Sequence, residues 1–154
     1  MKKLISIAAL CLLVLAVTAV GDERPWMDMK NCDYCKAFTA EKGLMEHMTK
    51  EYHSIANGVA TVTYVDKEYK EAFGRAMASC NAIAESMKKG EKHNVCQYCE
   101  NLGSFMQAGS KQDDFTSHDA MVTVYSSADA AMIAKMHDWC KKTNDAMAKM
   151  AHAE

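Results

Sequence analysis

A short cysteine motif occurs twice in this chain, and the duplication constrains the fold more than any other feature. Residues 31–35 read Asn-Cys-Asp-Tyr-Cys, and residues 95–99 read Val-Cys-Gln-Tyr-Cys. Each copy is therefore a Cys-x-x-Cys pair with tyrosine just before the second cysteine. A pair that recurs in this form indicates that one ancestral unit is used twice.

A second block of the sequence supports the same interpretation. Residues 62–89 align without a gap on residues 122–149, and the alignment matches Cys80 with Cys140. All three cysteines of one copy thus recur in the same order in the other. The repeat predicts that the two halves of the chain share one local fold.

Each copy predicts a helix, a β-hairpin and a second helix. In the first copy, the dipeptide Asn57-Gly58 is a hairpin signal between expected strands over residues 51–55 and 60–65. Apolar residues at helical spacing predict a helix on either side of it. The first helix is expected to carry Cys35, Phe38, Met45 and Met48. The second is expected to carry Tyr69, Phe73, either Met77 or Ala76, Cys80, Ile83 and Met87.

The second copy repeats this order with a tighter hairpin. Strands are expected over residues 115–117 and 120–125, around His118-Asp119. The helix before them is expected to carry Val95, Cys99, Leu102 and Met106, and the helix after them Met132, Ile133, Met136, Cys140 and Met147.

The two copies are expected to fuse into one domain over residues 22–154. A two-stranded hairpin alone is marginally stable, so the copies, about residues 29–90 and 93–150, are predicted to share a four-stranded antiparallel sheet. Their helices would cover one face of it. The linker over residues 88–92 is too short to separate the copies. The predicted fold class is α+β, with two tandem helix–hairpin–helix repeats.

The N-terminus has the layout of a signal peptide. Two lysines precede an apolar run over residues 4–20, and small residues stand at Ala19 and Gly21, where a peptidase would cut. We therefore expect residues 1–21 to be removed and the protein to be exported, either secreted or periplasmic. The alternative is a retained anchor, for which the run is short.

Charge argues against several classes of partner. Without the leader, the 18 basic side chains fall to 16 against 20 acidic ones, a net charge of −4, and the lysines do not cluster. Nucleic acids and anionic membranes need a concentrated positive surface, so neither is expected as a partner. After cleavage no stable membrane insertion is expected either. The remaining partner classes are another protein or a second copy of this chain.

The cysteine pairs have the spacing of metal ligands. Residues three apart share one side of a helix, so both thiols of a pair point at one place. Cys32, Cys35, Cys96 and Cys99 would then form a tetrahedral set for a soft transition metal ion: zinc, copper or iron. Further candidate ligands are the third cysteine of each copy and two nearby histidines. These are Cys80, Cys140, His93 and His137.

The methionines add an argument for a soft ion. Twelve of the 13 lie beyond Met1, and Met29 and Met77 stand where the second copy has His93 and His137. Methionine is a core filler as well as a thioether ligand, so core packing is an equal interpretation of this richness.

Two other uses of the cysteines remain open. A disulfide-braced interaction protein would pair Cys32 with Cys35, Cys96 with Cys99 and Cys80 with Cys140, as an oxidising compartment favours. A thiol–disulfide oxidoreductase is the third option, although the only proline, Pro25, precedes both motifs and leaves no candidate for the cis-proline of thioredoxin-like folds. No other catalytic constellation is evident, so we expect a binding protein rather than an enzyme.

Overall fold

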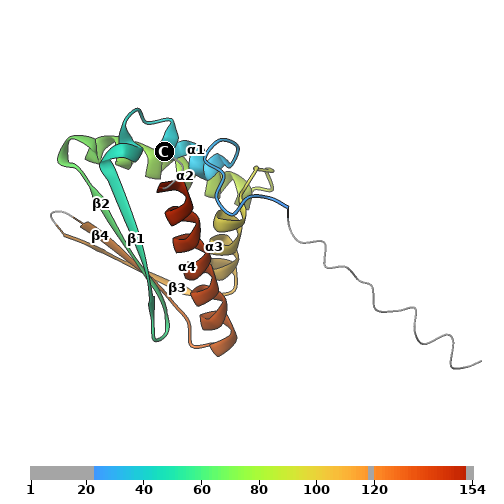
Figure 1. Cartoon of the computed structure of the whole chain (residues 1–154). Helices are drawn as coiled ribbons and strands as arrows, with labels where there is room; N and C mark the ends of the chain where they lie inside the picture. Colours follow the sequence, from blue (N-terminus) through green and yellow to red (C-terminus); the bar gives the residue numbers. More distant parts are fainter. Residues whose placement is uncertain (1–22, 118–119, 152–154) are drawn as a thin grey trace, which may run out of the picture.

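A computed structural model describes residues 23–117 and 120–151 of the chain (Figure 1). The expected signal peptide and the dipeptide His118-Asp119, at the expected tip of the second hairpin, lie outside the described residues. Within the described ranges, no helix has the length and apolar character that a membrane span requires.

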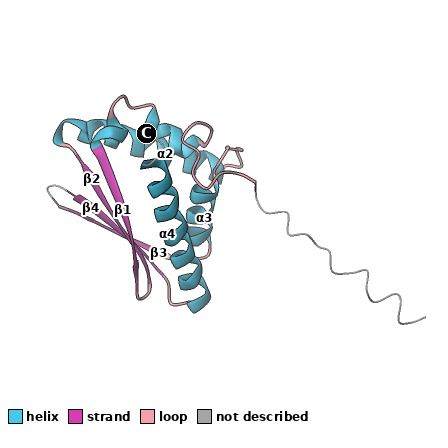
Figure 2. Ribbon diagram, viewed as in Figure 1, coloured by secondary structure: helices cyan, strands magenta, loops and turns pink. Residues whose placement is uncertain are grey.

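The chain alternates between helices and hairpins (Figure 2). One helix, one hairpin and one longer helix occur in this order twice, with two 3₁₀ turns in the first half. The elements are α1 (Asp33–Thr39), η1 (Leu44–His47), β1 (Met48–Ile55), β2 (Gly58–Val65), η2 (Lys67–Tyr69), α2 (Lys70–Lys88), α3 (Gln97–Gln107), β3 (Lys111–Thr116), β4 (Ala120–Ser126) and α4 (Ala130–Ala151).

The four strands form one antiparallel sheet in the order β1-β2-β4-β3. The α+β class and the four-stranded antiparallel sheet are therefore confirmed. The two hairpins meet through β2 and β4 at the centre of the sheet, where Val62 lies opposite Val122. Helix α4 packs on β1 and β2 from one side (Figure 1).

The turn of the first hairpin differs by one residue from the prediction. Gly58 pairs with Ile55, so the two loop residues are Ala56 and Asn57, and Gly58 is the first residue of β2. The glycine is needed for another reason. A Cβ atom at this position would lie 1.9 Å from the carbonyl oxygen of Tyr125 on β4. Glycine thus allows the close approach of the two central strands.

The first helix is shorter than predicted. Helix α1 ends at Thr39, and Gly43 then adopts a φ of 76°, a left-handed conformation that breaks the helical path. The chain continues as η1, and Met48 begins β1 opposite Val65. The apolar spacing of Met45 and Met48 was therefore misleading. The long helices α2 and α4, by contrast, run over the stripes predicted for them.

Aromatic side chains fill the main core between the sheet and the helices α3 and α4. Trp139 of α4 lies at its centre, stacked on Tyr98 with 5.0 Å between ring centroids. Tyr52 of β1 meets both rings from the sheet and shares a hydrogen bond of 2.9 Å with the Tyr98 hydroxyl. The Trp139 indole N–H also donates to the carbonyl of Tyr98. The second cysteine motif, which contains Tyr98, is thereby fixed to the core.

The close approach at Gly58 generates a stability prediction. Gly58→Ala forces the backbones of β2 and β4 apart, and we expect it to lower the free energy of unfolding by roughly 2 kcal/mol or more. Gly74→Ala is the control, because a Cβ atom there meets nothing within 4 Å and Gly74 lies inside α2. That change should raise stability by about 0.5–1 kcal/mol. Urea unfolding of both variants checks this, and an unchanged midpoint for Gly58→Ala would refute the close-approach account.

Candidate metal centre

Four cysteine sulfurs converge at one point of the molecule. The Sγ atoms of Cys32, Cys35, Cys96 and Cys99 all lie within 4.8 Å of one another. The shortest contacts cross between the two motifs: 3.6 Å from Cys32 to Cys99, 3.8 Å from Cys35 to Cys96, and 3.9 Å from Cys35 to Cys99. The two Cys-x-x-Cys pairs, 61 residues apart at their nearest members, therefore make one cluster.

These distances fit metal coordination and do not fit disulfides. A tetrahedral ion with metal–sulfur bonds of about 2.3 Å has sulfur–sulfur edges of about 3.8 Å. A disulfide requires about 2.05 Å. The six cysteines of the described chain are all free thiols. The four clustered sulfurs can therefore hold a metal ion without large movement, whereas the disulfide frame would need each pair to close.

Both motifs adopt the same local structure. Cys32 precedes α1 and Cys96 precedes α3, each as the N-cap residue in an extended conformation. Cys35 and Cys99 follow as the third residue of the respective helix. Because an N-cap residue and the third helical residue lie on the same side of the first turn, each pair presents both sulfurs in one direction.

A set of hydrogen bonds joins the two motifs next to the sulfurs. The Asp33 N–H donates to the carbonyl of Asn94 over 2.8 Å, and the Asn94 N–H returns a bond of 3.1 Å to the Asp33 carboxylate. The side-chain amide of Asn94 also donates to the carbonyl of Asn31 over 3.0 Å. We call Asn31, Asp33 and Asn94 the clasp. Its hydrogen bonds join the two motifs without using the sulfurs.

The segment before the first motif supports the second one. The first two N–H groups of α3 have no partner inside the helix. They donate instead to the carbonyls of Pro25 and Trp26, over 3.4 Å from Gln97 and 2.8 Å from Tyr98. Arg24 adds contacts to the Val95 carbonyl and to the Glu100 carboxylate. The start of α3 is thereby satisfied by backbone rather than by a capping side chain.

Proton sharing among the four sulfurs separates their acidities. Hydrogen bonds from Cys35, Cys96 and Cys99 hold the pKa of the Cys32 thiol well below its ordinary value. At Cys96 the contact with Cys32 acts to raise the pKa, but bonds from Cys35 and Cys99 outweigh it and lower the pKa to about 6.

The other two thiols keep their protons. The pKa of Cys35 is raised by its contacts with Cys32 and then Cys96, and the pKa of Cys99 is raised by contacts with all three neighbours. Four thiolates in contact would repel one another, so the cluster favours a mixture of thiolates and thiols. A divalent cation removes this repulsion and allows all four to ionise.

The cluster is enclosed by protein. Cys32 is 1% exposed, Cys96 is 3% exposed, and Cys35 is also buried, while Cys99 is half-buried. Four protein sulfurs complete a tetrahedral shell and leave no position for water or substrate, which is the arrangement of structural rather than catalytic metal sites.

The structure does not bring the two candidate histidines into the cluster. The His93 ring lies between two other partners, with Nδ1 3.1 Å from the Asp33 carboxylate and Nε2 against the Ser86 hydroxyl. His137 directs Nε2 to the carbonyl of Ile55 at 2.9 Å. Both rings are held by hydrogen bonds that a ligand role would break.

The third cysteine of each copy also lies outside the cluster. Cys80, midway along α2, has its sulfur 3.7 Å from the carbonyl of Tyr34, and burial raises its pKa to about 11. Cys140 is buried in the main core, with its sulfur near the Asn144 amide. Each therefore packs as a small apolar residue against different neighbours.

Sequence reasoning did not identify the clasp. Asp33 and Asn94 lie 61 residues apart in the sequence, and they meet only when the two motifs are already side by side. One signal was available: Asp33 is an acidic residue in the first turn of α1, where a carboxylate is favoured and where it often binds backbone N–H groups.

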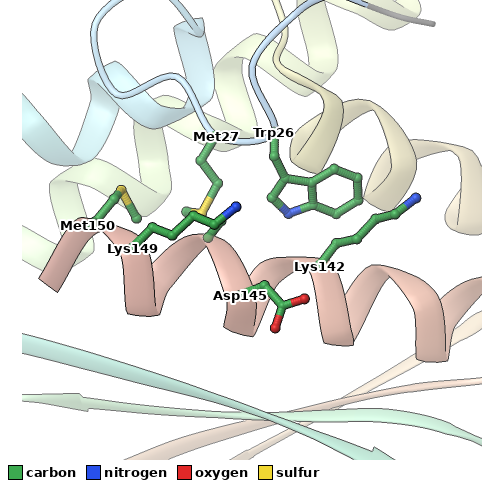
Figure 3. Close-up of a pocket in the computed structure, with 7 residues that line it drawn as sticks. Trp26, Met27, Lys142, Asp145, Lys149 and Met150 are labelled. Atoms are coloured by element: carbon green, nitrogen blue, oxygen red, sulfur yellow. The ribbon is translucent and has the colours of Figure 1, made fainter. Parts of the chain in front are cut away.

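A surface cavity elsewhere in the molecule lacks a cluster of metal-binding side chains like that of the four cysteines. A cavity of about 400 Å³ lies between the N-terminal segment and α4 (Figure 3). Two of its charged groups are paired, since Lys142 binds Asp138 and Asp145 binds Lys141. None of the six cysteines lines it. The lining residues are Trp26, Met27, Lys142, Asp145, Ala146, Lys149 and Met150.

The placement of the histidines generates a prediction. His93→Gln and His137→Gln should each leave the metal content per chain unchanged, because neither ring reaches the sulfurs. We expect His93→Gln to lower the melting temperature modestly, since it removes the hydrogen bonds of the ring with Asp33 and Ser86. Elemental analysis of the purified variants tests this. Loss of the metal from either variant would show that its histidine is a metal ligand, against this prediction.

Comparisons with models of protein families, with curated proteins and with solved structures find no match to this chain. Its function therefore has to follow from the chemistry of the four-sulfur cluster.

Proposed function

We propose that this chain is an exported, non-enzymatic protein that binds one Zn²⁺ through the thiolates of Cys32, Cys35, Cys96 and Cys99. The observation that carries the proposal is the convergence of four free sulfurs at contacts of 3.6–3.9 Å. Tetrahedral coordination by four sulfurs is typical of zinc or iron. Among the described residues, no histidine or carboxylate joins the four sulfurs in this group.

The proposed role of the metal is structural. It cross-links the start of α1 to the start of α3, and the chain between these helices contains β1, β2 and α2. Closing so long a loop removes conformations from the unfolded chain, and only the folded chain presents all four ligands together. Metal binding would thus contribute directly to the free energy of folding.

The internal duplication belongs to the same proposal. Val62 and Val122, equivalent residues at an offset of 60, lie opposite each other at the centre of the sheet. An antiparallel pair in which equivalent residues face each other has local twofold symmetry. Each copy then contributes one cysteine pair, so the duplication accounts for a site that a single copy could not complete.

If the protein is exported as proposed, a bound metal ion would protect the cysteine thiols from oxidation. The leader-like residues 1–21 predict an oxidising destination, where unprotected thiols pair as disulfides. Metal binding and disulfide formation need the same thiolates, so the bound ion would keep the four cysteines reduced. The disulfide-braced protein remains the competing function and is separated by the experiment below.

A titration tests the proposal. Reduced protein at about pH 7 should bind one Zn²⁺ per chain and release about two protons, because Cys35 and Cys99 are the thiols with raised pKa. As pH falls, protons compete for the same sulfurs and the affinity should fall. The melting temperature should rise on binding, since the ion binds only the folded state.

Two variants locate the effect. Cys99→Ser should abolish most of the thermal gain, because serine does not replace a thiolate ligand. Cys80→Ala is the matched control, which should keep one ion per chain and lose about 1 kcal/mol through packing. The isolated protein could instead have no free thiols and, after reduction, a melting temperature that Zn²⁺ does not change. That result would refute the metal-binding proposal in favour of the disulfide-braced interaction protein.

A further inference from the structure

The two central strands turn their polar side chains toward the helices. Thr61 and Thr63 of β2 and Thr123 of β4 are each at most 5% exposed, and they share a face with the core residues Val59 and Tyr125. The hydroxyl of Thr63 is buried with no hydrogen-bond partner. At Thr63 an aliphatic side chain would therefore be more stable. Thr123 is satisfied by a hydrogen bond of 2.6 Å to the Asp114 carboxylate.

The opposite face carries the apolar residues. Tyr64 is 44% exposed and Phe115 is 60% exposed, and the side chains between them are half-buried only by one another. None of these side chains packs against the main core or against the smaller cluster formed by Leu44, Ala72 and Ala76. Figure 2 shows the helices gathered on the other side of the sheet. We call this set the outer face: Ala60, Val62, Tyr64, Val122, Val124 and Phe115.

This distribution is the reverse of what a half-solvated sheet needs. An antiparallel sheet with one wet face normally places apolar residues inward and polar residues outward. Here both β2 and β4 place threonine inward and valine outward. A one-residue slip cannot correct the pattern, because it would expose Val59 and Tyr125. The sequence therefore suits a sheet that is buried on both faces.

We propose that the outer face binds a second copy of this chain, in a symmetric dimer of two sheets packed face to face. The proposal is independent of the metal centre, whose sulfurs lie among the helices. A face that binds its own copy has to complement itself, and the polar residues His53 and Asp113 at its two edges do so.

The charges at the edges select the arrangement. His53 on β1 and Asp113 on β3 lie on the same side of the sheet as the outer face. They stand at the same height along the strands, because His53 pairs with Ala60, Ala60 with Val124, and Val124 with Asp113. A twofold axis parallel to the strands stacks β1 of each copy on β3 of the other. It thereby brings each His53 over the Asp113 of the other copy.

The alternative symmetry is unfavourable. An axis at right angles to the strands, through Val62 and Val122, would stack β1 on β1 and place the two copies of Glu51 against each other. Like charges in contact oppose association. The axis parallel to the strands avoids this contact.

The size of the face indicates a weak dimer. Four strands about 4.8 Å apart and six to eight residues long, at about 3.3 Å per residue, span roughly 400 Å². Two copies together would bury about 800–1,000 Å², near the lower limit for a specific interface. We therefore expect dissociation constants in the micromolar range or above.

Sedimentation of the metal-loaded protein tests the dimer. From about 5 to about 500 μM, the protein should pass reversibly from monomer to dimer. Val122→Glu places a charge at the centre of the outer face and should weaken association at least tenfold. Ala78→Glu adds the same charge at an exposed position of α2 and should leave association unchanged.

Further variants keep the proposal falsifiable if Val122→Glu fails to fold. Phe115→Ser changes an exposed edge residue and should also weaken the dimer. His53→Asp should weaken it, and adding Asp113→His should restore it. A protein that stays monomeric throughout, or that dimerises equally well with Phe115→Ser and Val122→Glu, overturns the proposal. Binding to lipid vesicles that Val122→Glu abolishes, without self-association, would assign the face to a membrane instead.

Discussion

The mutual approach of four cysteine sulfurs is the constraint on which the rest of this structure depends. Thiolates this close repel one another. Hydrogen-bonding contacts with the neighbouring sulfurs, the largest cause, raise the pKa of Cys35 and Cys99. The approach is stable only if a cation or retained protons neutralise the cluster. The hydrogen bonds of the clasp also join the two motifs, and they do not use the sulfurs.

The sheet and the aromatic core determine where the cluster forms. The two hairpins meet at β2 and β4, and Gly58 allows the close approach of β2 to the Tyr125 carbonyl. Trp139 then binds Tyr98 through stacking and through its indole N–H, so the second motif is anchored to α4. The first motif reaches it through Asp33 and Asn94. The contacts that stabilise the fold thus also position the four cysteine sulfurs.

Sequence patterns predicted the parts of the site that are local. Spacing of three residues placed Cys32 with Cys35 and Cys96 with Cys99, and the repeat suggested that the pairs would meet. Partners of His93 and Cys80 could not be predicted, because they are set by the packing of segments distant in sequence. The extent of α1 was misjudged for a different reason: one glycine conformation at Gly43 outweighed a helical apolar spacing. Alternation in β2 and β4 was visible, but alternation alone does not tell which face meets the helices.

X-ray absorption at the metal edge of the protein as isolated from its own cells tests the central claim most directly. The account predicts one zinc per chain, with four sulfur neighbours at about 2.3 Å and no nitrogen or oxygen in the first shell. A shell containing nitrogen would require a histidine that the structure places elsewhere. Protein free of metal, with Cys32, Cys35, Cys96 and Cys99 paired as disulfides, would contradict the account outright.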